Sequence, residues 1–226
     1  DDVSEYVFSR TYTEILSKVF RSGYDLYLWI LIGAGACDEM AYIAKTILQE
    51  KGYEAYIAGF PGEDHFFAVI HINGSWIVLD PGYLQSRFVS LEERIMHRIR
   101  EYGNISSIIV YTDNNSFIEL TQYYVPYDTF VIHVTSANEP VVDACIVLKH
   151  RFHGITMEIP GKGLCFYTNE SGYVIIHLGG SIYNRSSAKP YDPYFEIYIN
   201  GKATGVHIQS IASVSYTHLR AHETEA

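Results

Sequence analysis

The chain has few basic residues and no cluster of them, which limits the partners that it can bind. Of its 226 residues, 16 are lysine or arginine and 26 are aspartate or glutamate, so the formal net charge is −10 at pH 7. Proteins that bind nucleic acid or anionic membrane surfaces usually concentrate positive charge on one face. The composition therefore argues against nucleic acid and anionic membranes as partners.

Long apolar runs are absent as well. The longest, such as residues 26–36, are shorter than the roughly 20 residues that a membrane-spanning helix requires. We therefore predict no transmembrane segment. The chain begins with Asp1 rather than methionine, which is compatible with the removal of a signal peptide or of an upstream domain.

Cysteine is scarce, and the three present show neither metal-ligand spacing nor a disulfide framework. They are Cys37, Cys145 and Cys165, and the odd number leaves at least one thiol. Cys145 and Cys165 can pair if neighbouring strands carry them, although buried unpaired cysteines are more common. The histidines show no metal-ligand spacing either, so we infer no metal and no cofactor.

What the sequence does contain is enough apolar residues, 48%, for a folded protein with a sizeable core. Helical and strand patterns are mixed up to about residue 128, whereas residues 129–212 consist of short strands separated by turns. We predict an α+β domain at 1–128 followed by an all-β sandwich at 129–212. The alternative is one continuous fold in which the late strands extend the first sheet. Residues 213–226 resemble a peptide translated from a sequencing adapter, and we expect this tail to be non-native.

The segment HFFAVIHINGSWIVLDPGY, residues 65–83, predicts a β-hairpin with a histidine at one end and an aspartate at the other. Asn73-Gly74 is a strong signal for a two-residue turn, and it fixes the register of the two strands. In this register His65 and Asp80 are diagonal neighbours on one face, with Cα atoms roughly 7–8 Å apart. An imidazole and a carboxylate at that separation can reach each other.

Two helices are predicted around this hairpin. One begins near Cys37 and ends before Gly52, with an apolar face at helical spacing, and the other begins after Ser90 with a capping-box pattern. A helix N-terminus lowers the pKa of a thiol, although Asp38 and Glu39 partly oppose this effect. Cys37 is therefore a candidate nucleophile. The set would be completed by His65 as the base and Asp80 as the residue that orients it.

Together these segments resemble the core of the transglutaminase-like superfamily, a branch of the papain-like cysteine enzymes. The resemblance covers residues 33–83 and depends on four segments: GACDE at 35–39, KGYEA at 51–55, HFFAV at 65–69 and GSWIVLDP at 74–81. It implies a papain-like α+β core, a helix carrying the cysteine packed on an antiparallel sheet. It also implies Cys37 as nucleophile, His65 as base and acid, and Asp80 as the orienting residue.

The sequence also departs from the family's pattern. Asp38 follows Cys37 where the animal cross-linking enzymes carry tryptophan, which weakens the case for cross-linking. The side chain of the oxyanion hole cannot be assigned, and Tyr24, Tyr27 and Trp29 are its candidates.

Each proposed site residue also has a purely structural interpretation. A lone cysteine in an apolar helix is usually a core residue, a lone histidine is often structural, and an aspartate before a proline often ends a strand. Their joint occurrence favours catalysis. Phe66, Phe67 and Tyr83 flank the site and are candidates for the lining of an acyl-substrate groove, although we expect core packing for at least two of them. His71 is assigned to structure.

The sequence thus predicts a thiol-dependent hydrolase or acyltransferase acting on a protein or peptide substrate, foremost a peptidase or amidase. The alternatives are a protein-crosslinking transglutaminase and a non-catalytic cell-surface binding protein on a papain-like scaffold. Residues 129–212 resemble transthyretin-like or carboxypeptidase-regulatory modules, which imply a spacer or a surface that docks a partner. Five Asn-x-Ser sequons are compatible with an extracellular or cell-surface location, and a cytoplasmic one stays open.

Overall fold

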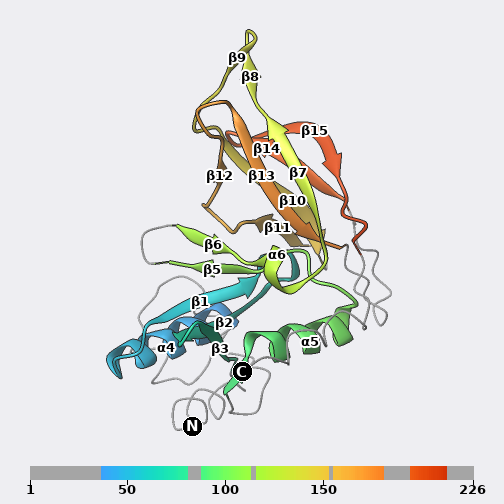
Figure 1. Cartoon of the computed structure of the whole chain (residues 1–226). Helices are drawn as coiled ribbons and strands as arrows, with labels where there is room; N and C mark the ends of the chain where they lie inside the picture. The colour runs from blue at the N-terminus through green and yellow to red at the C-terminus, as the bar shows by residue number, and fades with distance from the viewer. Residues whose placement is uncertain (1–36, 81–87, 113–115, 153–154, 181–193, 213–226) are drawn as a thin grey trace. The chain divides into compact units, whose positions relative to one another are not determined.

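A computed structural model of the chain describes residues 37–80, 88–112, 116–152, 155–180 and 194–212 (Figure 1). The predictions for residues 33–36, Tyr24, Tyr27, Trp29, Tyr83 and the tail at 213–226 lie outside these residues. The elements of the amino-terminal half are α4 (Cys37–Glu50), β1 (Ala55–Phe60), the short 3-10 helix η1 (Pro61–Glu63), β2 (His65–Ile72), β3 (Ser75–Leu79), β4 (Phe88–Ser90), α5 (Leu91–Tyr102), β5 (Ile109–Tyr111), β6 (Phe117–Glu119) and α6 (Thr121–Tyr124). Strands follow: β7 (Tyr127–His133), β8 (Thr135–Ser136), β9 (Glu139–Pro140), β10 (Cys145–Phe152), β11 (Ile155–Ile159), β12 (Phe166–Tyr167), β13 (Tyr173–Gly179), β14 (Phe195–Ile199) and β15 (Lys202–Ile208).

The described residues form two compact units. Unit 1 takes its residues from Asp1–Gly59, His65–Arg94 and Val110–Ile118, and unit 2 takes them from Phe60–Asp64, Ile95–Ile109 and Glu119–Ala226. Helices and several antiparallel sheets occur together, so the mixed, strand-rich class predicted from the sequence is confirmed at this coarse level. The predicted division at residue 128 concerns independent folding, and it stays a prediction.

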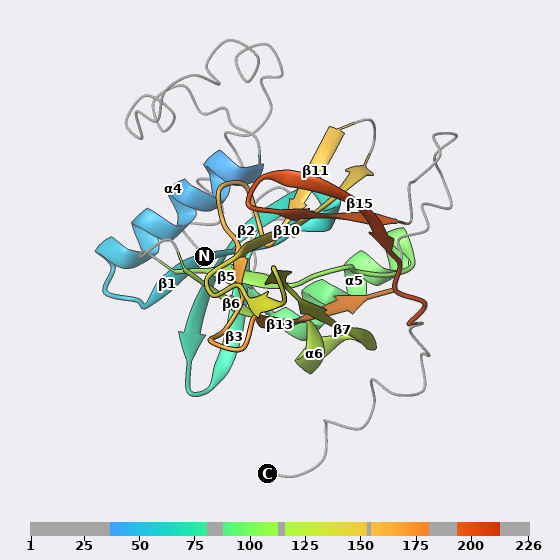
Figure 2. The same cartoon turned by 90° about the horizontal axis from the view of Figure 1, so that it is seen from above.

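Unit 1 contains most of a six-stranded sheet with the strand order β4-β3-β2-β1-β5-β6. Strands β2 and β3 form the predicted hairpin (Figure 2). Ile72 is paired with Ser75 across the turn. Asn73 and Gly74 both have positive φ, 50° and 81°, as a two-residue turn of this type requires. The register predicted from the Asn-Gly turn is therefore confirmed.

Helix α4 packs against β2 and covers part of the unit 1 core (Figure 1). Its buried side chains recur at helical spacing, as expected for a helix with one face against a sheet. They are Ala41, Ile43, Ala44 and Leu48. Gly52, with φ of 87°, ends the helix: its amide donates to the carbonyl of Gln49, and the next amide donates to the carbonyl of Leu48. The predicted helix and its glycine end are confirmed.

Helix α5 begins with the predicted cap, since the amide of Glu93 donates to Ser90 Oγ at 3.1 Å. The buried positions of α5 follow the spacing i, i+3, i+4, i+7 and i+8, and they are Leu91, Arg94, Ile95, Arg98 and Ile99. Two arginines therefore occupy a stripe that is otherwise apolar.

Unit 2 contains a sheet with the order β11-β10-β14-β15, in which β12 also pairs with β10, and a two-stranded sheet of β13 and β7. Alternate side chains of β10 and β13 are buried, which means that one face of each sheet is covered. These are Ile146, Leu148 and His150 on β10, and Val174, Ile176 and Leu178 on β13. Strands β14 and β15 form a second hairpin, since they pair on either side of Asn200-Gly201, where both residues have positive φ.

Cys145 and Cys165 form a disulfide. The expectation that unpaired cysteines are the commoner outcome is wrong for these two residues. Cys145 begins β10, which pairs with β12, and Cys165 directly precedes β12. Their Cα atoms are consequently 5.1 Å apart, within the range that a disulfide bridges.

Candidate active site

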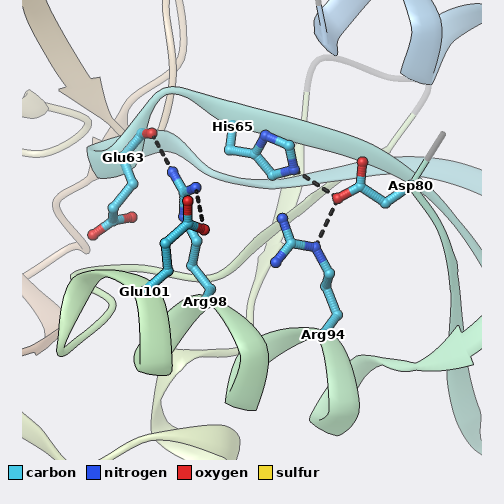
Figure 3. Close-up of polar contacts among 6 residues, drawn as sticks. All are labelled: Glu63, His65, Asp80, Arg94, Arg98 and Glu101. Atoms are coloured by element: carbon cyan, nitrogen blue, oxygen red, sulfur yellow. Dashed lines mark hydrogen bonds and ion pairs between the residues drawn. The ribbon is translucent and has the colours of Figure 1, made fainter. Parts of the chain in front are cut away.

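A hydrogen bond between His65 and Asp80 forms the centre of the candidate site. His65 is the first residue of β2 and Asp80 directly follows β3, so the hairpin register brings them to the same end of the hairpin. Nε2 of His65 lies 2.7 Å from Oδ2 of Asp80 (Figure 3). The side chains are 14% and 2% exposed. The contact predicted from the hairpin is present.

Arg94, in the first turn of α5, is a second partner of Asp80. Its Nε donates a hydrogen bond of 2.7 Å to the same oxygen, Oδ2 (Figure 3). The Arg94 side chain is fully buried. Sequence reasoning missed Arg94. The available signal was its place on the buried stripe of the predicted helix, because a buried arginine requires an anion or carbonyl groups as partners.

The charge of Asp80 follows from these neighbours. Burial raises the pKa of the Asp80 carboxyl, but the hydrogen bond from His65 and the positive charges of His65 and Arg94 outweigh that effect, so the pKa lies below its ordinary value of 3.8. Asp80 is therefore a carboxylate at neutral pH and can only accept hydrogen bonds. Nε2 of His65 therefore carries a hydrogen in both states of the ring. In the protonated ring, whose charge lowers the pKa of Asp80, Nδ1 carries a hydrogen too, and in the neutral ring Nδ1 is the basic nitrogen.

Cys37 is the first residue of α4, as predicted, and lies outside the disulfide. Its side chain is partly buried. Since α4 packs against β2, the helix that begins with this thiol lies against the strand that begins with His65. The helix N-terminus favours a thiolate, whereas the exposed Asp38 beside it opposes one.

The aromatic residues beside the site pack into unit 1. Phe67 is fully buried, with its ring centroid 5.9 Å from that of His65. Phe66 is partly buried against Tyr111, with ring centroids 5.9 Å apart. Core packing is therefore confirmed for Phe67. His71 is exposed and its ring lies against Trp76, at 4.6 Å between centroids, away from the His65 end of β2.

Two kinds of feature that would point to another class of protein are absent from the described ranges. Within the described ranges, no group of three or more His, Cys, Asp or Glu side chains is placed to hold a metal ion. No helix in that part of the chain is long and apolar enough to cross a membrane.

Comparison of the chain with protein-family models, with curated proteins and with solved structures found no match. The resemblance to the transglutaminase-like superfamily therefore stays a prediction from residues 33–83. A function must be inferred from the chemistry of Cys37, His65, Asp80 and Arg94.

Proposed function

We propose that the chain is a thiol-dependent hydrolase of peptide or other amide bonds, with Cys37 as nucleophile, His65 as base and acid, and Asp80 as the residue that orients His65. The observation that most supports this proposal is the state of His65. Its Nε2 lies 2.7 Å from a carboxylate, which fixes a hydrogen on Nε2 and makes Nδ1 the basic nitrogen of the neutral ring. A histidine fixed in one tautomer is the base that a cysteine nucleophile needs.

The reaction follows from these roles. Nδ1 of His65 takes the proton of the Cys37 thiol, and the thiolate attacks the carbonyl carbon of the amide to give a tetrahedral oxyanion. The imidazolium then returns the proton to the nitrogen of the leaving amine as the carbon–nitrogen bond breaks. The product is a thioester on Cys37. Water then attacks the thioester while His65 takes one proton from that water. The carbon–sulfur bond breaks, the imidazolium returns the proton to the Cys37 sulfur, and the carboxylic acid is released.

The same residues serve acyl transfer up to the thioester, because the two reactions differ only in whether water or an amine attacks it. Hydrolysis is the primary proposal because Cys37 is followed by Asp38 instead of the tryptophan of cross-linking enzymes. A glutamine-containing peptide incubated with a labelled amine separates the two reactions. Cleavage without label supports hydrolysis, whereas incorporated label replaces it with transfer.

The disulfide supports a location for this activity. Disulfides persist in oxidising compartments and are rare in the cytosol. The Cys145–Cys165 pair therefore favours an extracellular or cell-surface protein. In this proposal the sheets of unit 2 form a β-sandwich of the transthyretin-like kind, which docks a surface or a partner.

Alkylation of the full chain tests the nucleophile without a known substrate. An ordinary thiol, with a pKa of about 8.5, is almost wholly protonated at pH 6, and it reacts slowly with iodoacetamide. We expect native Cys37 to react at least roughly tenfold faster at pH 6 than the same thiol in urea, and His65→Ala to remove the difference. Cys145 cannot serve as the reference thiol because it is in the disulfide. Equal rates for the native and the unfolded protein would overturn the proposal.

A further inference from the structure

We infer that Arg94 is a positioning residue of this site: it holds the Asp80 carboxylate so that Asp80 fixes His65 in the tautomer that accepts the thiol proton. The inference rests on the proposed function, since it requires His65 to act as a base.

Arg94 contacts Asp80 directly through a hydrogen bond. Oδ2 of Asp80 accepts one hydrogen bond from Nε of Arg94 and one from Nε2 of His65, each at 2.7 Å. The two donors come from different elements, α5 and β2, so rotation of the carboxylate breaks at least one of the bonds (Figure 3). The bond from Arg94 therefore restricts the orientation in which Asp80 meets His65.

Arg94 itself has little freedom to move. Its side chain is fully buried, and its guanidinium carbon lies 5.8 Å from the ring centroid of Phe67. Phe67 is also fully buried and has the His65 ring as another neighbour. The ring of Phe67 thus lies near both partners of Asp80, the His65 ring and the Arg94 guanidinium, within unit 1.

The charge of Arg94 provides a second effect. A buried carboxylate beside a neutral imidazole tends to take up a proton, because burial disfavours its charged form. A protonated Asp80 would donate its hydrogen to Nε2 of His65 and would place the ring's own hydrogen on Nδ1, which could then no longer act as the base. The guanidinium of Arg94 opposes this outcome by keeping a positive charge beside Asp80.

The same helix supplies a matched comparison. Arg98 is also buried on α5, but its Nη2 donates to the backbone carbonyl of Glu63 at 2.8 Å and its Nη1 lies 3.5 Å from Glu101 (Figure 3). Neither partner belongs to the candidate site. A change at Arg98 therefore tests what the loss of a buried arginine from this helix does by itself.

Three variants of the full chain test the inference: Arg94→Gln, Arg94→Met and, as the control, Arg98→Gln. Glutamine carries an amide nitrogen at the chain position of Nε, so it can keep the bond to Asp80 without the charge. Methionine keeps the approximate length and provides neither a donor nor a charge. The rate of Cys37 alkylation is measured from pH 5 to 10, and the melting temperature is measured alongside.

Removing a positive charge near His65 raises the affinity of the ring for protons. The plot of the alkylation rate against pH has a midpoint that we assign to the titration of His65. We expect both Arg94 variants to shift this midpoint upward by about one pH unit. We also expect the alkylation rate at pH 6 to be roughly tenfold lower in Arg94→Met than in Arg94→Gln, since His65 is no longer held in the required tautomer. Arg98→Gln should lower the melting temperature and leave the midpoint unchanged.

Unchanged midpoints in the Arg94 variants, or a shift equal to that of Arg98→Gln, would reduce Arg94 to a folding residue and overturn the inference. If Arg94→Met shows no cooperative melting, the midpoint of Arg94→Gln decides alone. A wild-type plot of alkylation rate against pH with a single midpoint, at the ordinary thiol pKa of about 8.5, has a different meaning. It would refute the proposed function itself, before any Arg94 variant is considered.

Discussion

Each unit contains a histidine that contacts a carboxylate, and the two pairs differ mainly in their surroundings. In unit 1, Nε2 of His65 lies 2.7 Å from Asp80, and in unit 2, Nδ1 of His177 lies 2.9 Å from Glu119. The carboxylate of the first pair is 2% exposed, whereas that of the second is 15% exposed. The contact alone would not tell the two pairs apart.

The neighbours of each carboxylate indicate what each pair can do. Glu119 also accepts the amide of Thr121 at 2.6 Å, so it stabilises the start of the short helix α6, while Tyr127 packs edge-on against the ring of His177. Asp80 instead has Arg94 as a second cation and lies at the end of a hairpin whose strand β2 packs against α4. Under the proposed function, the pair in unit 1 differs in that α4, which packs against β2, begins with the candidate nucleophile Cys37.

Removal of the histidine from each pair should have the largest effect. We expect His65→Ala to lower kcat/KM for amide hydrolysis by roughly a thousandfold or more, because the base and the acid of both steps are lost. His177→Ala should change it by less than about twofold. The double variant Cys37→Ala/His65→Ala should be little worse than either single variant, because the two residues act as a unit. Similar losses from His65→Ala and His177→Ala would break the distinction between the pairs.

Neutralising each carboxylate compares their contributions to stability. Asp80→Asn leaves the Arg94 charge buried without its anion, and we expect it to cost about 3–5 kcal/mol of unfolding free energy. Glu119→Gln affects a partly exposed pair, so we expect a cost of about 1 kcal/mol or less. Urea denaturation at pH 7 measures both values. A larger loss for Glu119→Gln than for Asp80→Asn would contradict this account of the charges.

A third carboxyl, Glu63 of unit 2, sharpens the contrast through its dependence on pH. Glu63 is 1% exposed, and its Oε1 accepts the amide of Ser106 at 2.7 Å. Among the described residues no donor reaches its Oε2. Burial raises its pKa to about 7 from 4.5, although the Ser106 bond and the charge of Arg98 act in the opposite direction. Asp80 is the reverse case, with a lowered pKa.

The sign of the effect follows from proton binding. Between pH 4.5 and about 7 the folded protein binds the Glu63 proton more tightly than the unfolded chain does, so stability falls as pH rises through this range and then levels off. The 2.5-unit difference corresponds to at most about 3 kcal/mol. We expect Glu63→Gln to match the wild type near pH 4.5 and to exceed it in stability at pH 8. Urea titrations of the two proteins at both pH values test this, and parallel pH curves would contradict it.

Local chemistry explains which parts of the fold the sequence predicted. The Asn73-Gly74 turn determines the hairpin register through two positive φ angles, and that register brings His65 and Asp80 together. Gly52 and Ser90 mark the helix boundaries because each interacts with backbone groups only a few residues away. These predictions depend on short stretches of chain.

What the sequence did not predict depends on segments that are distant along the chain. Arg94 contacts Asp80 only because the folded chain places the start of α5 beside the end of β3, and no local sequence pattern identifies Asp80 as its partner. Glu63 lies in a Pro-Gly-Glu-Asp stretch whose sequence gives no sign of burial, yet its Oε1 accepts the amide of Ser106, a residue 43 positions away. The pairing of Cys145 with Cys165 likewise required knowing that β10 and β12 are neighbours.

The disulfide determines how many sulfhydryl groups the protein has. The chain has three cysteines, and Cys145 and Cys165 are joined, so each intact molecule carries a single sulfhydryl, that of Cys37. A colorimetric thiol assay of the native protein therefore gives the stoichiometry of Cys37 directly. One equivalent per chain means that Cys37 is fully reduced, and a smaller fraction measures its oxidation during storage. A reductant strong enough to restore Cys37 can also open the disulfide by thiol–disulfide exchange, in which case the assay rises toward three equivalents.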